Sequence, residues 1–118
     1  MKNKPISPGM HGLTDYAFGL ALMTVPALMN ADRKTVKYYQ MMAAQIFLYS
    51  AVTKQPYALA PLIPLPIHKK IDIGNLVGLT LFAANPGVHR RKNLLVFHIG
   101  MTALGLINVL FTNWKNHK

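Results

Sequence analysis

His11-Gly-Leu-Thr-Asp15 and His68-Lys-Lys-Ile-Asp72 stand 57 residues apart, and each opens a long apolar stretch of the chain. These two aspartates belong to a set of only three acidic residues among 118. A carboxylate placed one helical turn into an apolar membrane segment is costly, so its presence there needs a reason. The repeated spacing predicts that the chain is built from two related halves.

The composition is typical of a membrane protein. Apolar residues make up 52% of the chain and charged residues 14%, whereas about 25% is usual for charged residues in a soluble domain. The net charge of +10 would suit nucleic acid only if basic residues covered one face of a soluble fold. The Lys and Arg residues instead lie almost wholly between apolar runs, as in loops that touch anionic lipid. We therefore expect no nucleic-acid partner, and the absence of cysteine excludes disulfides and thiol chemistry.

Four apolar runs predict an all-α fold, namely an integral membrane four-helix bundle in one domain, residues 1–118. A helix that crosses the membrane at a right angle needs about 20 residues. The two middle runs are shorter than this, so they depend on flanking Lys and Tyr side chains that reach the headgroups. Both termini are expected on the same side of what is predicted to be the bacterial cytoplasmic membrane. Lys and Arg are almost evenly divided between the two sides, so the orientation stays open. The runs are 12–29, 38–52, 71–84 and 94–111.

The connections between these runs differ in character. Two are short and basic, and their side chains are expected to contact anionic lipid headgroups. The third, 55–67, is apolar and contains four prolines, which exclude a regular helix. We expect it to be extended or broken, lying in the membrane interface or packed on the bundle. The predicted headgroup contacts are Arg33, Lys34, Lys37, Arg90, Arg91 and Lys92.

The spacing of the His–Asp pairs predicts a tandem duplication of a two-helix unit. The first repeat covers about 11–54, the linker 55–67, and the second repeat about 68–112. A proline is expected to end each odd-numbered span, at Pro26 and Pro86. Repeats without inversion are related by an axis along the membrane normal, so both His–Asp pairs should lie at similar depth near the terminal side.

The pattern resembles the SPW-repeat family of small bacterial membrane proteins. The matching stretches are His11-Gly-Leu-Thr-Asp15-Tyr-Ala-Phe-Gly19 with Val25-Pro26, and His68-Lys-Lys-Ile-Asp72 with Gly78 and Asn85-Pro86. The likeness covers roughly residues 11–112, although neither proline has a preceding Ser or a following Trp. The resemblance implies two repeats and four membrane helices, and it implies no particular activity.

Polar and small residues recur at three- and four-residue spacing within each predicted helix, which places them on one face. We expect these faces to meet inside the bundle, with Leu, Ile, Val and Phe towards lipid. Gly74-x-x-x-Gly78 is a small-residue motif that lets two helices approach closely. The residues expected to pack helices together are Gly19, Gly74, Gly78, Gln45, His98, Thr102, Gly105 and Asn108.

The two His–Asp pairs admit four interpretations. In the preferred, structural one, each Asp accepts from its own His or caps backbone amides in the first helical turn. Alternatively, His11, Asp15, His68 and Asp72 form one polar site that relays protons, binds a cation or holds a polar headgroup. Two His and two Asp also suffice for a divalent metal ion, and His11 with His68 for haem ligation. The preferred interpretation predicts no cofactor and no metal.

No nucleophile with a neighbouring base, phosphate loop or nucleotide motif is present, so no enzymatic activity is predicted. The favoured function is a non-enzymatic accessory or scaffold subunit in the membrane. Such a subunit would contact lipid and either self-associate or dock on a larger membrane complex. The alternatives are a small transporter, channel or proton-relay module that uses the His–Asp pairs, and a cofactor-bearing electron-transfer subunit.

Overall fold

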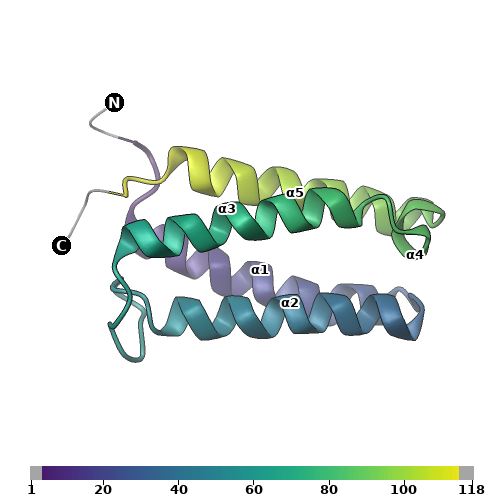
Figure 1. Cartoon of the computed structure of the whole chain (residues 1–118), viewed down its shortest axis with the longest axis horizontal. Coiled ribbons are helices and arrows are strands. Elements are labelled where there is room, and N and C mark those ends of the chain that lie inside the picture. The colour runs from purple at the N-terminus through teal and green to yellow at the C-terminus, as the bar shows by residue number, and fades with distance from the viewer. Residues whose placement is uncertain (1–3, 115–118) are drawn as a thin grey trace.

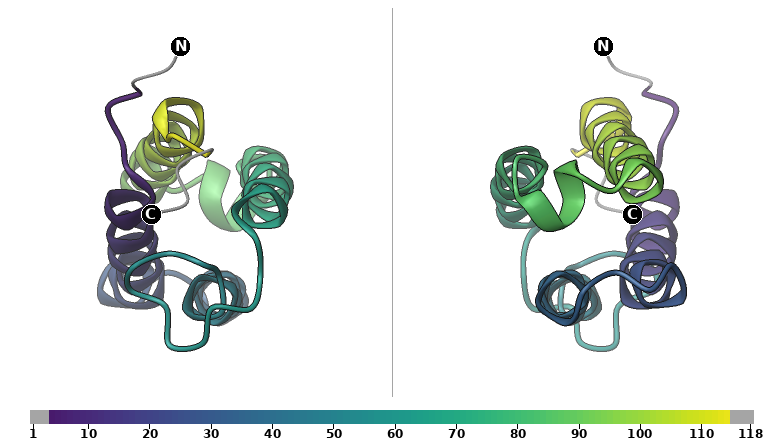
Figure 2. Two further views of the ribbon diagram at one scale, coloured as in Figure 1. Left: turned by 90° about the vertical axis from the view of Figure 1, so that its left-hand side faces the viewer. Right: turned by 90° about the vertical axis from the view of Figure 1, so that its right-hand side faces the viewer.

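The computed structural model describes residues 4–114, and throughout this part of the chain the regular structure is helical. Four long helices lie alongside one another, and one short helix precedes the last of them (Figures 1 and 2). The prediction of an all-α fold is confirmed. The helices are α1 (Pro8–Leu28), α2 (Arg33–Ala51), α3 (Leu65–Phe82), α4 (Pro86–His89) and α5 (Lys92–Phe111).

Side-chain caps fix where the first two helices begin. The Ser7 hydroxyl accepts from the Met10 backbone N–H at 3.1 Å, and the Asp32 carboxylate accepts from the Thr35 N–H at 2.8 Å. The backbone N–H of Thr35 lowers the pKa of the Asp32 carboxyl below its usual value. Because α2 begins at Arg33, the basic turn predicted for 30–37 is shorter than expected, and its cations lie in the first turns of a helix.

The prolines act differently from the prediction. Pro66 lies inside α3, which begins at Leu65, because a proline ring is tolerated in the first turn, where its missing N–H is not needed. Pro26 lies within the last turn of α1 and does not end it, while Pro86 begins α4. The helix-free segment predicted for 55–67 is therefore shorter than expected at its carboxyl end.

Two main-chain bridges join the segments that precede α1 and α3 to the ends of α5 and α2. Ile6 pairs with Thr112 and Ile63 pairs with Thr53, both in parallel orientation. The start of α1, the end of α5 and the proline-rich linker consequently share one end of the bundle (Figure 1). The hydrogen bonds are Ile6 N to Phe111 O (3.1 Å), Asn113 N to Ile6 O (2.8 Å), Ile63 N to Val52 O (2.7 Å) and Lys54 N to Ile63 O (2.8 Å).

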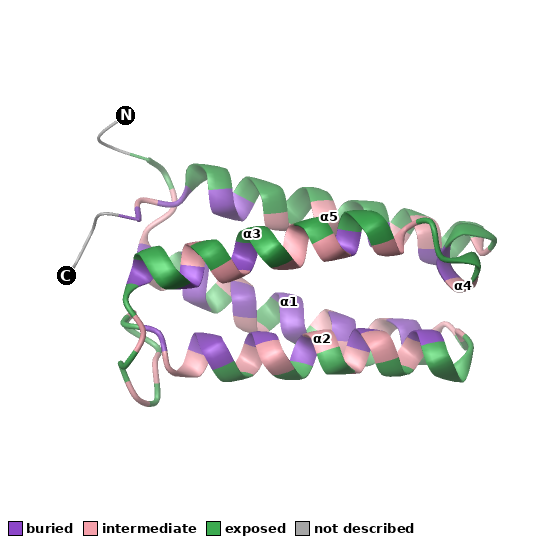
Figure 3. Ribbon diagram, in the orientation of Figure 1, coloured by how far each residue is buried: buried purple, intermediate pink, exposed green. Residues whose placement is uncertain are grey.

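The bundle encloses polar side chains towards its ends and exposes apolar ones on its outer faces. Figure 3 shows which parts of each helix are buried and which are exposed. The centre of the bundle is apolar, with Leu22 and Leu79 almost fully buried. Polar groups are also buried, and these are His11, Asp15, Thr35, Ser50, Thr53, His68, Asp72, His98, Asn108 and Thr112. Large apolar side chains are exposed on every long helix, among them Leu13, Leu20, Leu48, Ile73, Val77, Leu81, Val96, Ile99, Leu106 and Leu110.

One helix in the part of the chain that the structure describes, α5, is long and apolar enough to cross a membrane by length and composition. The prediction of four spans is not supported for the other three long helices by this criterion. The reason lies in their polar residues, since α2 opens with Arg33 and Lys34, and α3 carries Lys69, Lys70 and Asp72. Each such residue lowers the mean hydropathy of its helix, whichever way its side chain faces.

Arg91, predicted to contact lipid, binds instead to the end of α1. Its guanidinium donates to the carbonyls of Asn30 at 2.6 Å and Met29 at 2.7 Å, where the negative end of the helix dipole favours a cation. Asn30 has a φ of 58°, a left-handed conformation that asparagine tolerates. The other predicted headgroup contacts are exposed, and they are Arg33, Lys34, Lys37, Arg90 and Lys92.

Replacement of Arg91 by glutamine is expected to lower the free energy of unfolding by about 1 to 3 kcal/mol, because two hydrogen bonds from a charged donor are lost. Arg90→Gln is the matched control, since Arg90 is exposed one position earlier. The thermal midpoints of both variants in one detergent measure the difference. Equal midpoints would show that the contact with α1 contributes nothing to stability.

Candidate functional site

His11 and Asp15 of α1 meet His68 and Asp72 of α3 at one end of the bundle, and we call these four residues the quartet. His11 Nε2 lies 2.8 Å from Asp72 Oδ2 and 3.2 Å from Asp15 Oδ2. His68 Nε2 lies 2.8 Å from Asp15 Oδ2 and 3.3 Å from Asp72 Oδ2. All four residues are at least nine-tenths buried. The shorter contact of each imidazole therefore crosses between the helices, and each carboxylate lies between both imidazoles.

The outer nitrogen of each imidazole is held by a threonine from a neighbouring helix end. His11 Nδ1 lies 2.7 Å from Thr112 Oγ1, and His68 Nδ1 lies 2.6 Å from Thr53 Oγ1. Each threonine hydroxyl donates to the carbonyl four residues earlier in its own chain segment, so its oxygen accepts from the imidazole. Both Nδ1 atoms consequently carry a proton, and both Nε2 atoms face the carboxylates.

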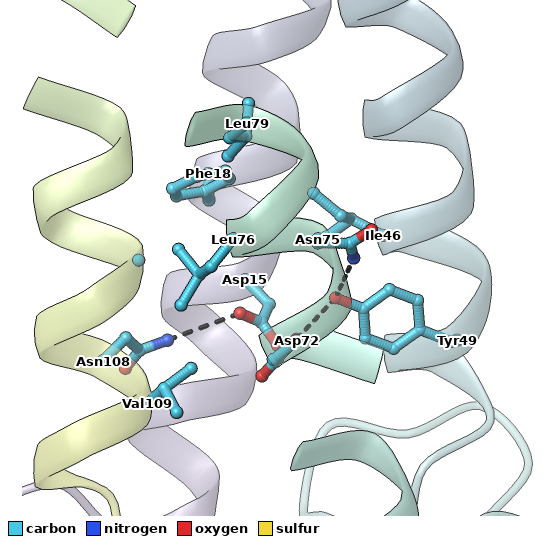
Figure 4. Close-up of a pocket in the computed structure, with 11 residues that line it drawn as sticks. Asp15, Phe18, Ile46, Tyr49, Asp72, Asn75, Leu76, Leu79, Asn108 and Val109 are labelled. Atoms are coloured by element: carbon cyan, nitrogen blue, oxygen red, sulfur yellow. Dashed lines mark hydrogen bonds between the residues drawn. The ribbon is translucent and has the colours of Figure 1, made fainter. Parts of the chain in front are cut away.

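The outer oxygens of the two carboxylates also have donors (Figure 4). The Tyr49 hydroxyl donates to Asp72 Oδ1 at 2.5 Å, and the Asn108 amide donates to Asp15 Oδ1 at 3.4 Å. Asn75 in turn donates to the Tyr49 hydroxyl at 2.9 Å. Each Oδ1 is thus used by a neighbouring side chain, and each Oδ2 is directed at the centre of the quartet. Asp15 Oδ2 also accepts from the Ser50 hydroxyl at 3.3 Å.

Trp114 covers the outer end of the quartet. Its ring centroid lies 4.6 Å from that of His11 and 6.0 Å from that of His68, and its Nε1 donates to Val109 O at 2.9 Å. The tryptophan is 8% exposed, so it shields the imidazoles from the outside. The quartet therefore lies in a closed environment close to the end of the bundle.

A small cavity adjoins the quartet on the side of the bundle centre. Its volume is about 30 Å³, and its lining includes Asp15, Asp72, Tyr49 and Asn108 (Figure 4). This is enough space for a water molecule. Asn108 Oδ1 is the one buried side-chain polar atom between residues 4 and 114 that has no hydrogen-bond partner. The cavity thus offers space beside the two carboxylates, and one of its lining residues has an unused acceptor.

A second polar group lies farther along the bundle, separate from the quartet. The His98 imidazole lies 2.5 Å from the Tyr39 hydroxyl and 2.6 Å from the Leu79 carbonyl oxygen, so it joins helices as predicted. Gln45 donates to Asn75 at 2.6 Å and also joins two helices. Thr102, however, donates to the His98 carbonyl within its own helix, because its hydroxyl folds back on the preceding turn.

The glycines predicted to pack helices together fall into two groups. A Cβ on Gly19 would lie 2.7 Å from the Phe47 ring, and one on Gly105 would lie 2.9 Å from Leu76, so both sites require glycine-sized residues. A Cβ on Gly74 would meet nothing within 4 Å, and one on Gly78 would only reach Tyr38 at 4.0 Å. The Gly74-x-x-x-Gly78 motif therefore brings no helices of this chain together.

The quartet residues were predicted as a possible polar site, but their supporting residues were not. Thr53, Thr112 and Trp114 were not predicted to belong to the His–Asp site, although they hold or cover the imidazoles. The two threonines do offer a signal, since each lies just beyond the end of an even-numbered long apolar run. Comparison with known proteins finds no matching family model, no matching curated protein and no matching solved structure.

Proposed function

We propose that this chain is a small, non-enzymatic integral membrane protein that holds a cation in a buried, charge-balanced site within its helical bundle. The observation that carries the proposal is the inverted polarity of the bundle. The charged quartet is enclosed, whereas every long helix exposes large apolar side chains, among them Leu20 on α1, Met41 and Leu48 on α2, Val77 on α3 and Val96 on α5. In water, exposed apolar surface on this scale would favour association, whereas in lipid it is the ordinary exterior of a protein.

The mean hydropathy of a whole helix understates how apolar its outer face is. The residues that make α1 and α3 less apolar include His11, Asp15, His68 and Asp72, and all four are directed away from the surroundings. Lipid would contact the outer faces, whose long side chains are mostly apolar. An intramembrane carboxylate that faces the bundle interior and has a partner is also what the cost of desolvation requires. The four spans predicted from the sequence remain part of this proposal.

The Lys and Arg side chains are distributed as expected for a bundle whose two ends lie at the two surfaces of a membrane. In residues 4–114, the Lys and Arg side chains lie near the two ends of the long helices, and most are exposed. Such positions allow contact with anionic headgroups at both surfaces. A groove between α3 and α5, about 570 Å³ in volume, combines apolar walls with Lys4 and Lys69. An acyl chain and its anionic headgroup would match this combination.

The experiment is extraction of membranes from expressing cells at alkaline pH, followed by detergent solubilisation. The chain is expected in the membrane pellet after alkaline treatment and in the supernatant only after detergent. The control is the Leu20→Lys, Leu48→Lys, Val77→Lys variant, which places charges on the outer faces and should lose membrane retention. Release of the wild-type chain by alkali alone would refute the proposed membrane location.

A proton relay is a second candidate, favoured by one specific observation. A continuous chain of hydrogen bonds joins Asp72 to Tyr49, Tyr49 to Asn75 and Asn75 to Gln45. This chain runs from the quartet towards the centre of the bundle. The apolar side chains of Leu22 and Leu79 then occupy the centre, and the His98 group lies beyond. Relay across the bundle would therefore require this apolar layer to open, so cation binding is the better-supported function.

A further inference from the structure

The quartet has the residues and geometry of a metal centre, and we propose that it binds one divalent first-row transition metal ion. The ligands are Nε2 of His11 and His68 and Oδ2 of Asp15 and Asp72. This inference rests on the proposed function and names the cation that the buried site would hold. Two imidazoles and two carboxylates suit zinc or a similar ion, because calcium and magnesium prefer oxygen ligands alone.

The distances between the ligand atoms fit such an ion. A tetrahedral site with metal–ligand bonds of about 2.0 Å has neighbouring ligand atoms about 3.3 Å apart. The four His–Asp contacts are 2.8, 2.8, 3.2 and 3.3 Å, and the ligand atoms of the group all lie within 4.8 Å of one another. The ligand atoms that lie farthest apart would have to approach one another by up to about 1.5 Å to place all four around one centre.

Each proposed ligand is oriented by a second contact, as in established metal sites. The imidazoles donate through Nδ1 to Thr112 and Thr53, which leaves Nε2 for the metal. The carboxylates accept on Oδ1 from Tyr49 and Asn108, so Oδ2 is the oxygen that faces the metal position. Asp15 Oδ2 also accepts from the Ser50 hydroxyl at 3.3 Å, and its second lone pair remains for the metal.

Charge balance favours the same ion. Without metal, each Nε2 needs a proton to hydrogen-bond with the carboxylates, so two imidazolium groups face two carboxylates and the quartet is neutral. With metal, two neutral imidazoles, two carboxylates and one divalent cation are again neutral. A single monovalent cation in place of both Nε2 protons would leave a net negative charge in a closed site, which is costly.

The adjoining cavity supplies an additional coordination position. It lies beside both carboxylates, and its volume of about 30 Å³ is sufficient for a water molecule. Asn108 also lines it, and the Oδ1 atom of that side chain has no hydrogen-bond partner. A water bound to the metal would donate to this oxygen and remove the unsatisfied group. A haem, by contrast, does not fit, because both Nε2 atoms lie in contact with the same two carboxylates.

The test is titration of the full chain, purified in detergent and freed of metal by a chelator, with Co²⁺ as the spectroscopic probe. Wild type is expected to bind one Co²⁺ per chain with visible absorption of a low-coordinate site, and Zn²⁺ should displace it. His11→Gln is expected to weaken binding at least 100-fold. His89→Gln is the matched control, since His89 is exposed on α4 and its loss should change nothing.

Thr112→Val keeps all four ligands and is the milder variant, in case His11→Gln fails to fold. It removes the nearer acceptor of His11 Nδ1 and the hydrogen bond from the Thr112 hydroxyl to Asn108 O, while Asn108 O remains 3.3 Å from Nδ1. It is expected to weaken Co²⁺ binding about 10- to 100-fold. Circular dichroism reports the fold of each variant. Absence of Co²⁺ binding by folded wild type, or wild-type affinity in folded His11→Gln, would overturn the metal site. A metal-free chain that still resists alkaline extraction would leave the membrane location standing.

Discussion

Replacement of Asp72 by leucine is expected to lower the free energy of unfolding by about 3 to 5 kcal/mol, measured without metal in mixed detergent micelles. The change removes one carboxylate and leaves two buried imidazoles beside a single negative charge. Breaking a buried ion pair from one side is costly in this way because the remaining charge keeps its desolvation penalty. Asp72 also accepts the Tyr49 hydroxyl, which would lose its acceptor as well.

The double variant His11→Leu, Asp72→Leu is expected to lose less stability than Asp72→Leu alone. It removes one positive and one negative group together, so the remaining His68 and Asp15 stay balanced at their contact of 2.8 Å. A double-mutant cycle with His11→Leu gives the coupling between the two positions. Strictly additive losses would show that no charge pairing stabilises the quartet. Asp32→Asn, at an exposed helix cap, is the control for loss of a carboxylate.

Leu22→Ala is expected to lower the free energy of unfolding by about 2 to 5 kcal/mol. Leu22 is fully buried in the apolar layer that separates the quartet from the His98 group, so truncation leaves a cavity. Leu20→Ala, two positions earlier, is the matched control because Leu20 is 59% exposed. It should change stability by less than about 0.5 kcal/mol. Equal losses from both variants would contradict the assignment of inner and outer faces.

The sequence predicted the long helices because apolar runs interrupted by basic segments are a strong pattern. It did not predict where they begin. Arg33 and Lys34 were read as turn residues, although the Asp32 cap starts α2 directly before them. Pro66 was read as excluding a helix, although a first-turn proline costs no hydrogen bond. Composition therefore located the helices, while side-chain capping decided their ends.

The site was predictable as a set of residues and not as a set of contacts. The spacing of His11 with Asp15 reports neighbours on one helix, which favoured the interpretation that each Asp serves its own His. In the structure the shorter contacts run to the other helix. Thr112 lies 101 residues from His11, and Thr53 lies on the other side of the proline-rich linker from His68, so only the packing of the bundle brings them to the imidazoles.

The duplication remains a prediction, but the two main-chain bridges have a consequence for it. Ile63 precedes α3 and pairs with the segment that follows α2, and Ile6 precedes α1 and pairs with the segment that follows α5. Each pairing is made by two backbone hydrogen bonds in the same arrangement. Each two-helix unit therefore starts next to the point where the other one stops. A second unit can be appended by one new connection at this end, with no helix passed through another. The proline-rich linker, which is mostly exposed and packs Ile63 against the core, is that connection.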